Sequence, residues 1–150
     1  MRTLVPSSAH AKVYGDLERR MKVQERRAWQ LAAQRTLVFT IDGLGSTITV
    51  GVKGDVAVDF NCQIAGWRLL ADQVGDLVVD VWKTDYFGFP GSVVNTIAAA
   101  DLPTLSSDDK AIDTALPGWT TKVSAGDIFR FNVDSVSAVT RATLTLALQT

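Results

Sequence analysis

The stretch that decides the fold is DLVVDVWK, residues 76–83. Leu77, Val79 and Val81 fall on one side of a two-residue period, and two aspartates and a tryptophan fall on the other. Successive side chains of a β-strand point to opposite faces of the sheet, so this spacing is typical of a strand with one buried face. We therefore expect residues 76–83 to form a core strand.

The same alternation recurs through the rest of residues 35–150, between short turn signals such as DGLG. Further strands are expected at TLVFTI (36–41), STITVGVK (46–53), GDVAVDFNCQI (54–64), GWRLLAD (66–72), VVNTIA (93–98), GWTTKV (118–123), DIFRFNV (127–133) and RATLTLALQ (141–149). In the second of these, Ile48, Val50 and Val52 are expected on one face, and SSDDKA (106–111) is expected to be a solvated loop. No helical pattern alternates with the strands, which argues against a parallel α/β sheet. The predicted fold is all-β, an antiparallel β-sandwich of jelly-roll type.

The first 35 residues differ in charge from the rest of the chain. They carry eight Lys or Arg and three Asp or Glu, a net charge of +5, whereas residues 36–150 carry seven and thirteen, a net charge of −6. Both glutamates of the chain lie in the first part. We therefore divide the chain into an extended arm (1–15), a short helix (16–34) that begins at Asp16, and the β-sandwich (35–150).

The expected helix carries a stripe at the a/d spacing of a coiled coil. Its members are Tyr14, Leu17, Met21, Gln24, Ala28 and Leu31. The stripe spans just over two heptads, so two interpretations remain open. The helix either brings several chains together or lies as a single amphipathic helix on the domain that follows. Basic side chains outside the stripe form a solvated face, and nucleic-acid binding is not expected because no recognised motif accompanies them.

The sequence lacks the residues that catalysis or metal binding would need. His10 is the only histidine and Cys62 the only cysteine, which excludes a Ser-His-Asp triad, a Cys-His pair and a zinc site. Cys62 is expected to be a small buried apolar residue. The aspartates stand in ordinary turns without the spacing of a calcium loop. We expect no enzyme activity, no metal and no cofactor. No apolar run is long enough to span a bilayer, so membrane insertion is not expected.

Several segments in order resemble a β domain that recurs in structural proteins of tailed bacteriophages and prophages. They are GVKGD (51–55), WRLLAD (67–72), VVDVWK (78–83), TIAAADLPTLSS (96–107), GWTT (118–121) and GDIFRFNVDS (126–135). The resemblance covers about residues 39–148. It implies a virion component, made in the host cytoplasm, that is fibre-like or exposed on the particle surface and has no enzymatic activity.

The resemblance and the layout together lead to one functional expectation. A homotrimer held by the helix would decorate the capsid as a cement protein, and the arm would dock on the major capsid protein or another virion protein. The docking residues expected in the arm are Arg2, Leu4, Val5, His10 and Lys12. The alternative is a short tail, neck or head fibre whose sandwich binds a host-surface glycan or receptor.

Residues 82–92 read WKTDYFGFPGS and contain four aromatic rings. Trp82 belongs to the strand at 76–83 and is expected to pack. Tyr86, Phe87 and Phe89 lie in the turn that follows, where they either contact a neighbouring protomer or form a platform for a glycan.

Overall fold

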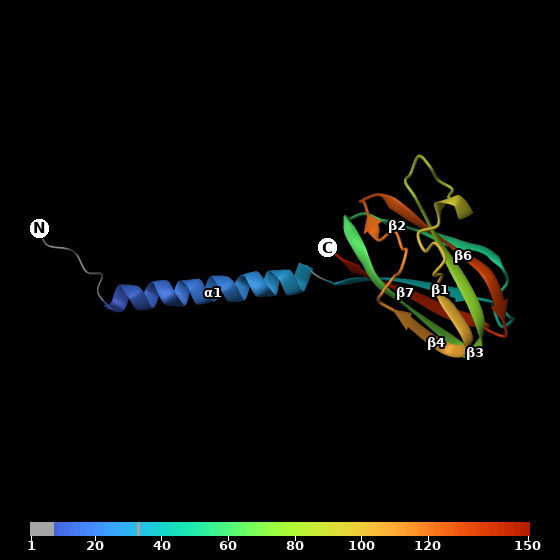
Figure 1. Cartoon of the computed structure of the whole chain (residues 1–150), viewed down its shortest axis with the longest axis horizontal. Helices are drawn as coiled ribbons and strands as arrows, with labels where there is room; N and C mark the ends of the chain where they lie inside the picture. Colours follow the sequence, from blue (N-terminus) through green and yellow to red (C-terminus); the bar gives the residue numbers. More distant parts are fainter. Residues whose placement is uncertain (1–7, 33) are drawn as a thin grey trace, which may run out of the picture. The chain divides into compact units, whose positions relative to one another are not determined.

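The computed structural model describes residues 8–32 and 34–150, which divide into two compact units, residues 1–34 and 35–150 (Figure 1). The first unit contains one helix, α1 (Ser8–Ala32), of 25 residues. The second contains a short 3-10 helix and seven strands. These are β1 (Arg35–Asp42), β2 (Gly51–Val58), β3 (Cys62–Thr84), η1 (Val93–Asn95), β4 (Thr104–Asp113), β5 (Lys122–Val123), β6 (Asp127–Ser137) and β7 (Arg141–Gln149).

Helix α1 begins eight residues before the predicted start, so the prediction of an extended arm over residues 1–15 is wrong for residues 8–15. The segment that follows Pro6 contains alanines and no further proline, and it continues through Gly15 at a cost of only about 1 kcal/mol. Asp16 is therefore an interior residue, and its carboxylate pairs with Arg20 one turn later at 3.4 Å. His10 and Lys12 lie on the helix, while residues 1–7, with Arg2, Leu4 and Val5, lie outside the described residues.

All strand pairs in the second unit are antiparallel, in the order β1-β7-β3-β6-β2, and β4 and β5 also pair with β3. The central strand β3 is 23 residues long and serves two layers. Residues 63–71 pair with β7, and residues 76–84 pair with β6. One layer is thus β1, β7 and the first half of β3, and the other is β2, β6 and the second half (Figure 1). The predicted all-β antiparallel sandwich is confirmed.

Several predicted strand boundaries are wrong. The segments at 66–72 and 76–83 are parts of one strand, and the predicted loop 106–111 lies inside β4. The expected strand at 93–98 is the 3-10 turn η1 followed by a single bridge between Thr96 and Trp82. Residues 46–50 precede β2, and the alternation predicted for Ile48, Val50 and Val52 is not observed. Ile48 is buried, whereas Val50 and, inside β2, Val52 are 62% and 45% exposed. Pairing with β3 decides the path of residues 106–111 and of Thr96 more strongly than their local residue preferences do.

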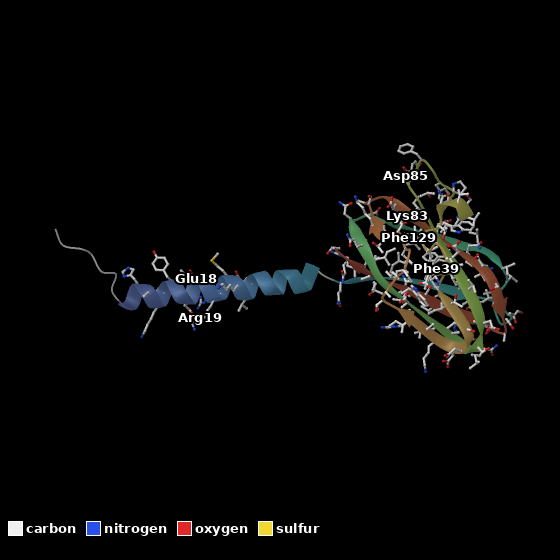
Figure 2. The ribbon with its side chains drawn as sticks, viewed as in Figure 1. Glu18, Arg19, Phe39, Lys83, Asp85 and Phe129 are labelled. Atoms are coloured by element: carbon white, nitrogen blue, oxygen red, sulfur yellow. The ribbon has the colours of Figure 1, made fainter. Side chains whose placement is uncertain are left out.

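The core lies between the two layers and is dominated by Phe, Leu and Val side chains. Phe39 of β1 stacks on Phe131 of β6 with ring centroids 4.2 Å apart, which joins the layers directly. Figure 2 shows Phe39 inside the sandwich. A Cβ atom at Gly54 of β2 would lie 3.0 Å from the Phe39 ring, so a side chain there would require the ring to shift by a few tenths of an ångström. Cys62 is 6% exposed, as predicted, and burial raises the pKa of its thiol.

The strands change layer at a corner, where residues 72–75 of β3 meet residues 138–140 between β6 and β7. A Cβ atom at Gly75 would lie 2.4 Å from the carbonyl oxygen of Ser137, so only glycine allows this approach. The Asp72 carboxylate accepts hydrogen bonds from the Thr140 hydroxyl, from the Thr140 amide at 3.2 Å and from the Arg141 amide at 3.0 Å. The corner is thus closed by one side chain that satisfies three donors.

The hydrogen bonds to Asp72 at the corner predict that the fold becomes less stable in acid. These hydrogen bonds, chiefly the one from the Thr140 hydroxyl, lower the pKa of Asp72 below its ordinary value of 3.8. A carboxylate whose pKa is lower in the folded state than in the unfolded state stabilises the fold at pH values above the unfolded-state pKa. This stabilisation is lost as the pH falls through the folded-state pKa. Urea unfolding at pH 7 should therefore show Asp72→Asn to be less stable than wild type, and the difference should shrink below pH 3.8. An unchanged difference at low pH would contradict this role for the Asp72 charge.

Candidate functional site

The first candidate surface is the apolar stripe of helix α1. Tyr14, Leu17 and Met21 are 67%, 49% and 60% exposed, and Gln24 is also exposed. The side chains of Ala28 and Leu31 fall outside what the structure describes. Two polar contacts join residues four apart on the helix: Arg19 Nε donates to the Gly15 carbonyl oxygen at 3.3 Å, and Arg20 pairs with Asp16. Glu18 and Arg19 project from different sides of the helix (Figure 2).

The second candidate surface is the segment 85–96, which we call the aromatic loop. It leaves the end of β3, projects beyond the sheets and returns through η1 (Figure 1). Tyr86 and Phe87 are 77% and 92% exposed, and their rings meet edge to face with centroids 5.6 Å apart. Val93 and Val94 are 62% and 85% exposed on the returning side. Four large apolar side chains thus face outward from one loop.

Hydrogen bonds within the aromatic loop fix its path. Asp85 accepts the Gly88 amide at 2.7 Å, and the Asn95 side-chain oxygen accepts the Ser92 amide at 3.0 Å. At the base of the loop, the Ile97 amide donates to the Val81 carbonyl oxygen at 2.9 Å. The tip is therefore held by polar contacts that point back into the loop.

Arg130 of β6 supports one side of the aromatic loop. Its guanidinium group lies 4.9 Å from the Phe89 ring centroid, within cation–π range. The same group binds both oxygens of Asp55, at 2.7 and 3.0 Å, and this bond raises the pKa of Arg130. A weaker contact of 3.4 Å reaches the Gly91 carbonyl oxygen. Phe89 is consequently a supporting ring, 43% exposed, and differs from the two outward rings.

A buried aspartate anchors the returning end of the loop. Asp80 is 3% exposed and accepts the Trp82 indole N–H at 2.7 Å and the Thr96 hydroxyl at 2.6 Å. The half-buried Trp82 therefore packs as expected and also donates a hydrogen bond. The alternating pattern predicted that Asp80 faces away from the core, but it could not show that a loop covers it.

The structure brings Tyr86 and Phe87 together and places Phe89 beside Arg130. Sequence reasoning missed Val93 and Val94, because VVNTIA was read as a strand. It also missed Arg130, which lies more than 30 residues away in the chain. The signal that could have found the valines is the Gly, Pro and Ser content immediately before them, which favours a turn.

No metal or catalytic constellation appears among the residues that the structure describes. No group of three or more His, Cys, Asp or Glu side chains there could hold a metal ion. A cavity of about 570 Å³ beside Cys62 is lined mostly by neutral side chains, namely Asn61, Cys62, Gln63, Val123, Gln149 and Thr150, together with Lys122. Among the described helical residues, none forms a segment apolar and long enough to cross a membrane.

Comparison with known proteins adds little beyond the fold. No protein-family model matches the chain, and no curated protein gives a significant match. One similar solved structure is described as "CBM4 structure and function", with 15% identity, 77% of this chain and 84% of that chain covered, and a TM-score of 0.33. Another is described as "Structure of infectious bursal disease virus Gx strain", with 16% identity, 79% and 32% covered, and a TM-score of 0.30. At these TM-scores neither likeness supports a functional argument.

Proposed function

We propose that the chain is a structural protein of a tailed-bacteriophage virion that assembles through helix α1 and displays its β-sandwich as a capsid decoration protein. The observation that carries this proposal is the exposed stripe of Tyr14, Leu17 and Met21 on a helix that forms its own unit. Apolar side chains at a/d spacing gain stability when helices bury them against one another. Three copies are proposed from the resemblance to phage structural proteins.

Docking to the shell is proposed for the residues before the helix. Arg2, Leu4 and Val5 precede Ser8, so removal of residues 1–7 leaves α1 whole. An oligomer multiplies weak contacts, because each bound copy raises the effective concentration of the next. Heads of the phage that encodes the chain, prepared without it, should bind the protein in a fixed ratio. Deletion of residues 1–7 should abolish that binding while the oligomer persists.

Assembly is tested by paired substitutions on α1. Leu17 and Val23 are both 49% exposed, but only Leu17 lies on the stripe. Leu17→Asp should weaken association by at least about a hundredfold, because an aspartate at a buried seam must be desolvated or expelled. Val23→Asp should leave the oligomer intact. Sedimentation velocity gives the mass of each variant, and a wild-type chain that sediments as a monomer at micromolar concentration would overturn the proposal.

A second function, a short fibre that contacts the host surface, is favoured by one separate observation. The aromatic loop presents Phe87 at 92% exposure from a path fixed by hydrogen bonds. Exposed apolar groups of this kind mark interaction sites more often than ordinary surface. Loss of cell binding in Phe87→Ala, with the oligomer unchanged, would support this function over decoration.

A further inference from the structure

We propose that the aromatic loop inserts its tip into the interface of a zwitterionic lipid bilayer. The inference rests on the second proposed function, since it names the host-surface component that the loop would contact. It concerns shallow insertion of one loop. Shallow insertion of one loop needs no apolar run long enough to span the bilayer.

The tip is apolar and free of charge. Residues 86–96 read YFGFPGSVVNT, without Asp, Glu, Lys or Arg. Tyr86, Phe87, Val93 and Val94 expose between 62% and 92% of their surface. Aromatic rings with one polar end are favoured at the boundary between lipid headgroups and acyl chains, and Phe and Val gain from leaving water there. The composition of the tip fits this boundary.

The charged and amide side chains around the tip each bond within the protein, and this disfavours a glycan. Sugar binding needs side-chain donors and acceptors that converge beside a stacked ring. Here Asp85 and Asn95 accept loop amides, and the Arg130 guanidinium is held by Asp55. A bilayer interface requires no directional partner, so it accepts a tip of this kind.

The charges of the domain that carries the loop disfavour anionic lipid at the loop. Residues 36–150 carry a net charge of −6, which anionic headgroups would repel. The two cations near the base of the loop are paired, Arg130 with Asp55 at 2.7 Å and Lys83 with Asp127 at 3.5 Å. Binding should therefore come from apolar contact and depend little on salt.

The fixed path of the aromatic loop lowers the entropic cost of binding to the bilayer. The loop is held at Gly88, Ser92 and Thr96 by side-chain hydrogen bonds, so little conformational entropy is lost when its tip enters the interface. One tip offers only a few side chains, and association through α1 would bring several tips to one surface.

Flotation of the full chain with phosphatidylcholine vesicles tests the proposal. At millimolar lipid, wild-type protein should float, and a roughly tenfold rise in salt should not release it. Phe87→Ser combined with Val94→Ser should reduce the bound fraction at least about tenfold. Leu44→Ser is the matched control, because Leu44 is 91% exposed in the β1–β2 connection and lies outside the loop. This control should bind like wild type.

Depth of insertion provides an independent measurement. The four native tryptophans give the wild type a background fluorescence. Vesicles of brominated phosphatidylcholine should quench Phe87→Trp protein more than wild type, and Leu44→Trp protein no more than wild type. Absence of flotation by the wild type, equal binding by the double variant, or binding that requires anionic lipid would each overturn the proposal. A change of sedimentation mass in the double variant without any lipid binding would assign the loop to a contact between protomers and would also overturn it.

The lipid contact and assembly through α1 can be disproved independently of each other. The test uses a protein that carries both Leu17→Asp and Phe87→Trp. If this protein is monomeric and brominated lipid still quenches it more than Leu17→Asp alone, the loop contacts lipid without the oligomer. An intact oligomer that ignores vesicles supports assembly and overturns the lipid contact.

Discussion

Phe131→Ala should lower the free energy of unfolding by about 3–5 kcal/mol, the usual cost of removing a buried phenylalanine. Phe131 is fully buried, and its ring stacks on Phe39 at a centroid distance of 4.2 Å with an angle of 13° between the rings. The contact joins β6 in one layer to β1 in the other. Its removal leaves a cavity where the two layers meet. For a domain of this size the melting temperature should fall by roughly 10–20 °C.

The same substitution at an exposed ring is the matched control. Phe87 is 92% exposed, so Phe87→Ala should change the free energy of unfolding by no more than about 0.5 kcal/mol. Urea unfolding followed by circular dichroism measures both variants. Equal losses for Phe87→Ala and Phe131→Ala would show that the stacked pair does not hold the layers together.

Alternation of apolar and polar residues was sufficient to predict the core face of the best strands. In β7 the inward residues Ala142, Leu144, Leu146 and Leu148 are all buried, as their spacing predicts. The same holds for Phe129, Phe131 and Val133 of β6. These strands lie in the interior of the sheet, where one face must pack on the opposite layer, so local pattern and tertiary environment agree.

The corner could not be predicted in the same way. ADQVGD, residues 71–76, contains turn-like residues and was read as a break between two strands. In the structure β3 continues through it, because Gly75 lets the Ser137 carbonyl oxygen approach and Asp72 satisfies three donors from residues 140 and 141. Those partners lie more than 60 residues away, beyond the range of any local pattern.

For the candidate surfaces, composition located the segments but not the roles of their residues. The spacing of Tyr14, Leu17 and Met21 indicated a stripe, whereas the start of the helix at Ser8 depends on weaker preferences around Gly15. The aromatic cluster at 86–89 was evident in the sequence. Its division into outward rings and a supporting ring depends on Arg130, which only the β3–β6 pairing brings near.

Asp80→Ala should destabilise the domain by about 2–4 kcal/mol, because it leaves two partly buried donors without their acceptor. The Asp80 carboxylate accepts from the Trp82 indole at 2.7 Å and from the Thr96 hydroxyl at 2.6 Å. On either side of it, Val79 and Val81 bond to the segment that covers the strand, through Pro103 and Ile97. Water cannot readily replace the lost acceptor at a site that is 3% exposed.

Two further variants distinguish the loss of these two hydrogen bonds from a general effect of removing a negative charge. Asp59→Ala removes an exposed aspartate and should cost no more than about 0.5 kcal/mol. Asp80→Asn keeps one oxygen acceptor and should fall between wild type and Asp80→Ala in urea unfolding. Equal stability of Asp80→Ala and Asp59→Ala would show that the buried bonds contribute nothing.

The same aspartate links the stability of the sandwich to the shape of the aromatic loop. Thr96 ends the loop, and the next amide, that of Ile97, bonds to β3. Loss of the Thr96 bond should therefore free the returning side of the loop before the core opens. Hydrogen exchange at the Ile97 amide should accelerate in Asp80→Ala more than exchange at core amides of β7, whereas uniform acceleration would mean that Asp80 supports the whole domain and not the loop in particular. The first outcome makes Asp80 the residue through which β3 holds the aromatic loop in the conformation seen here.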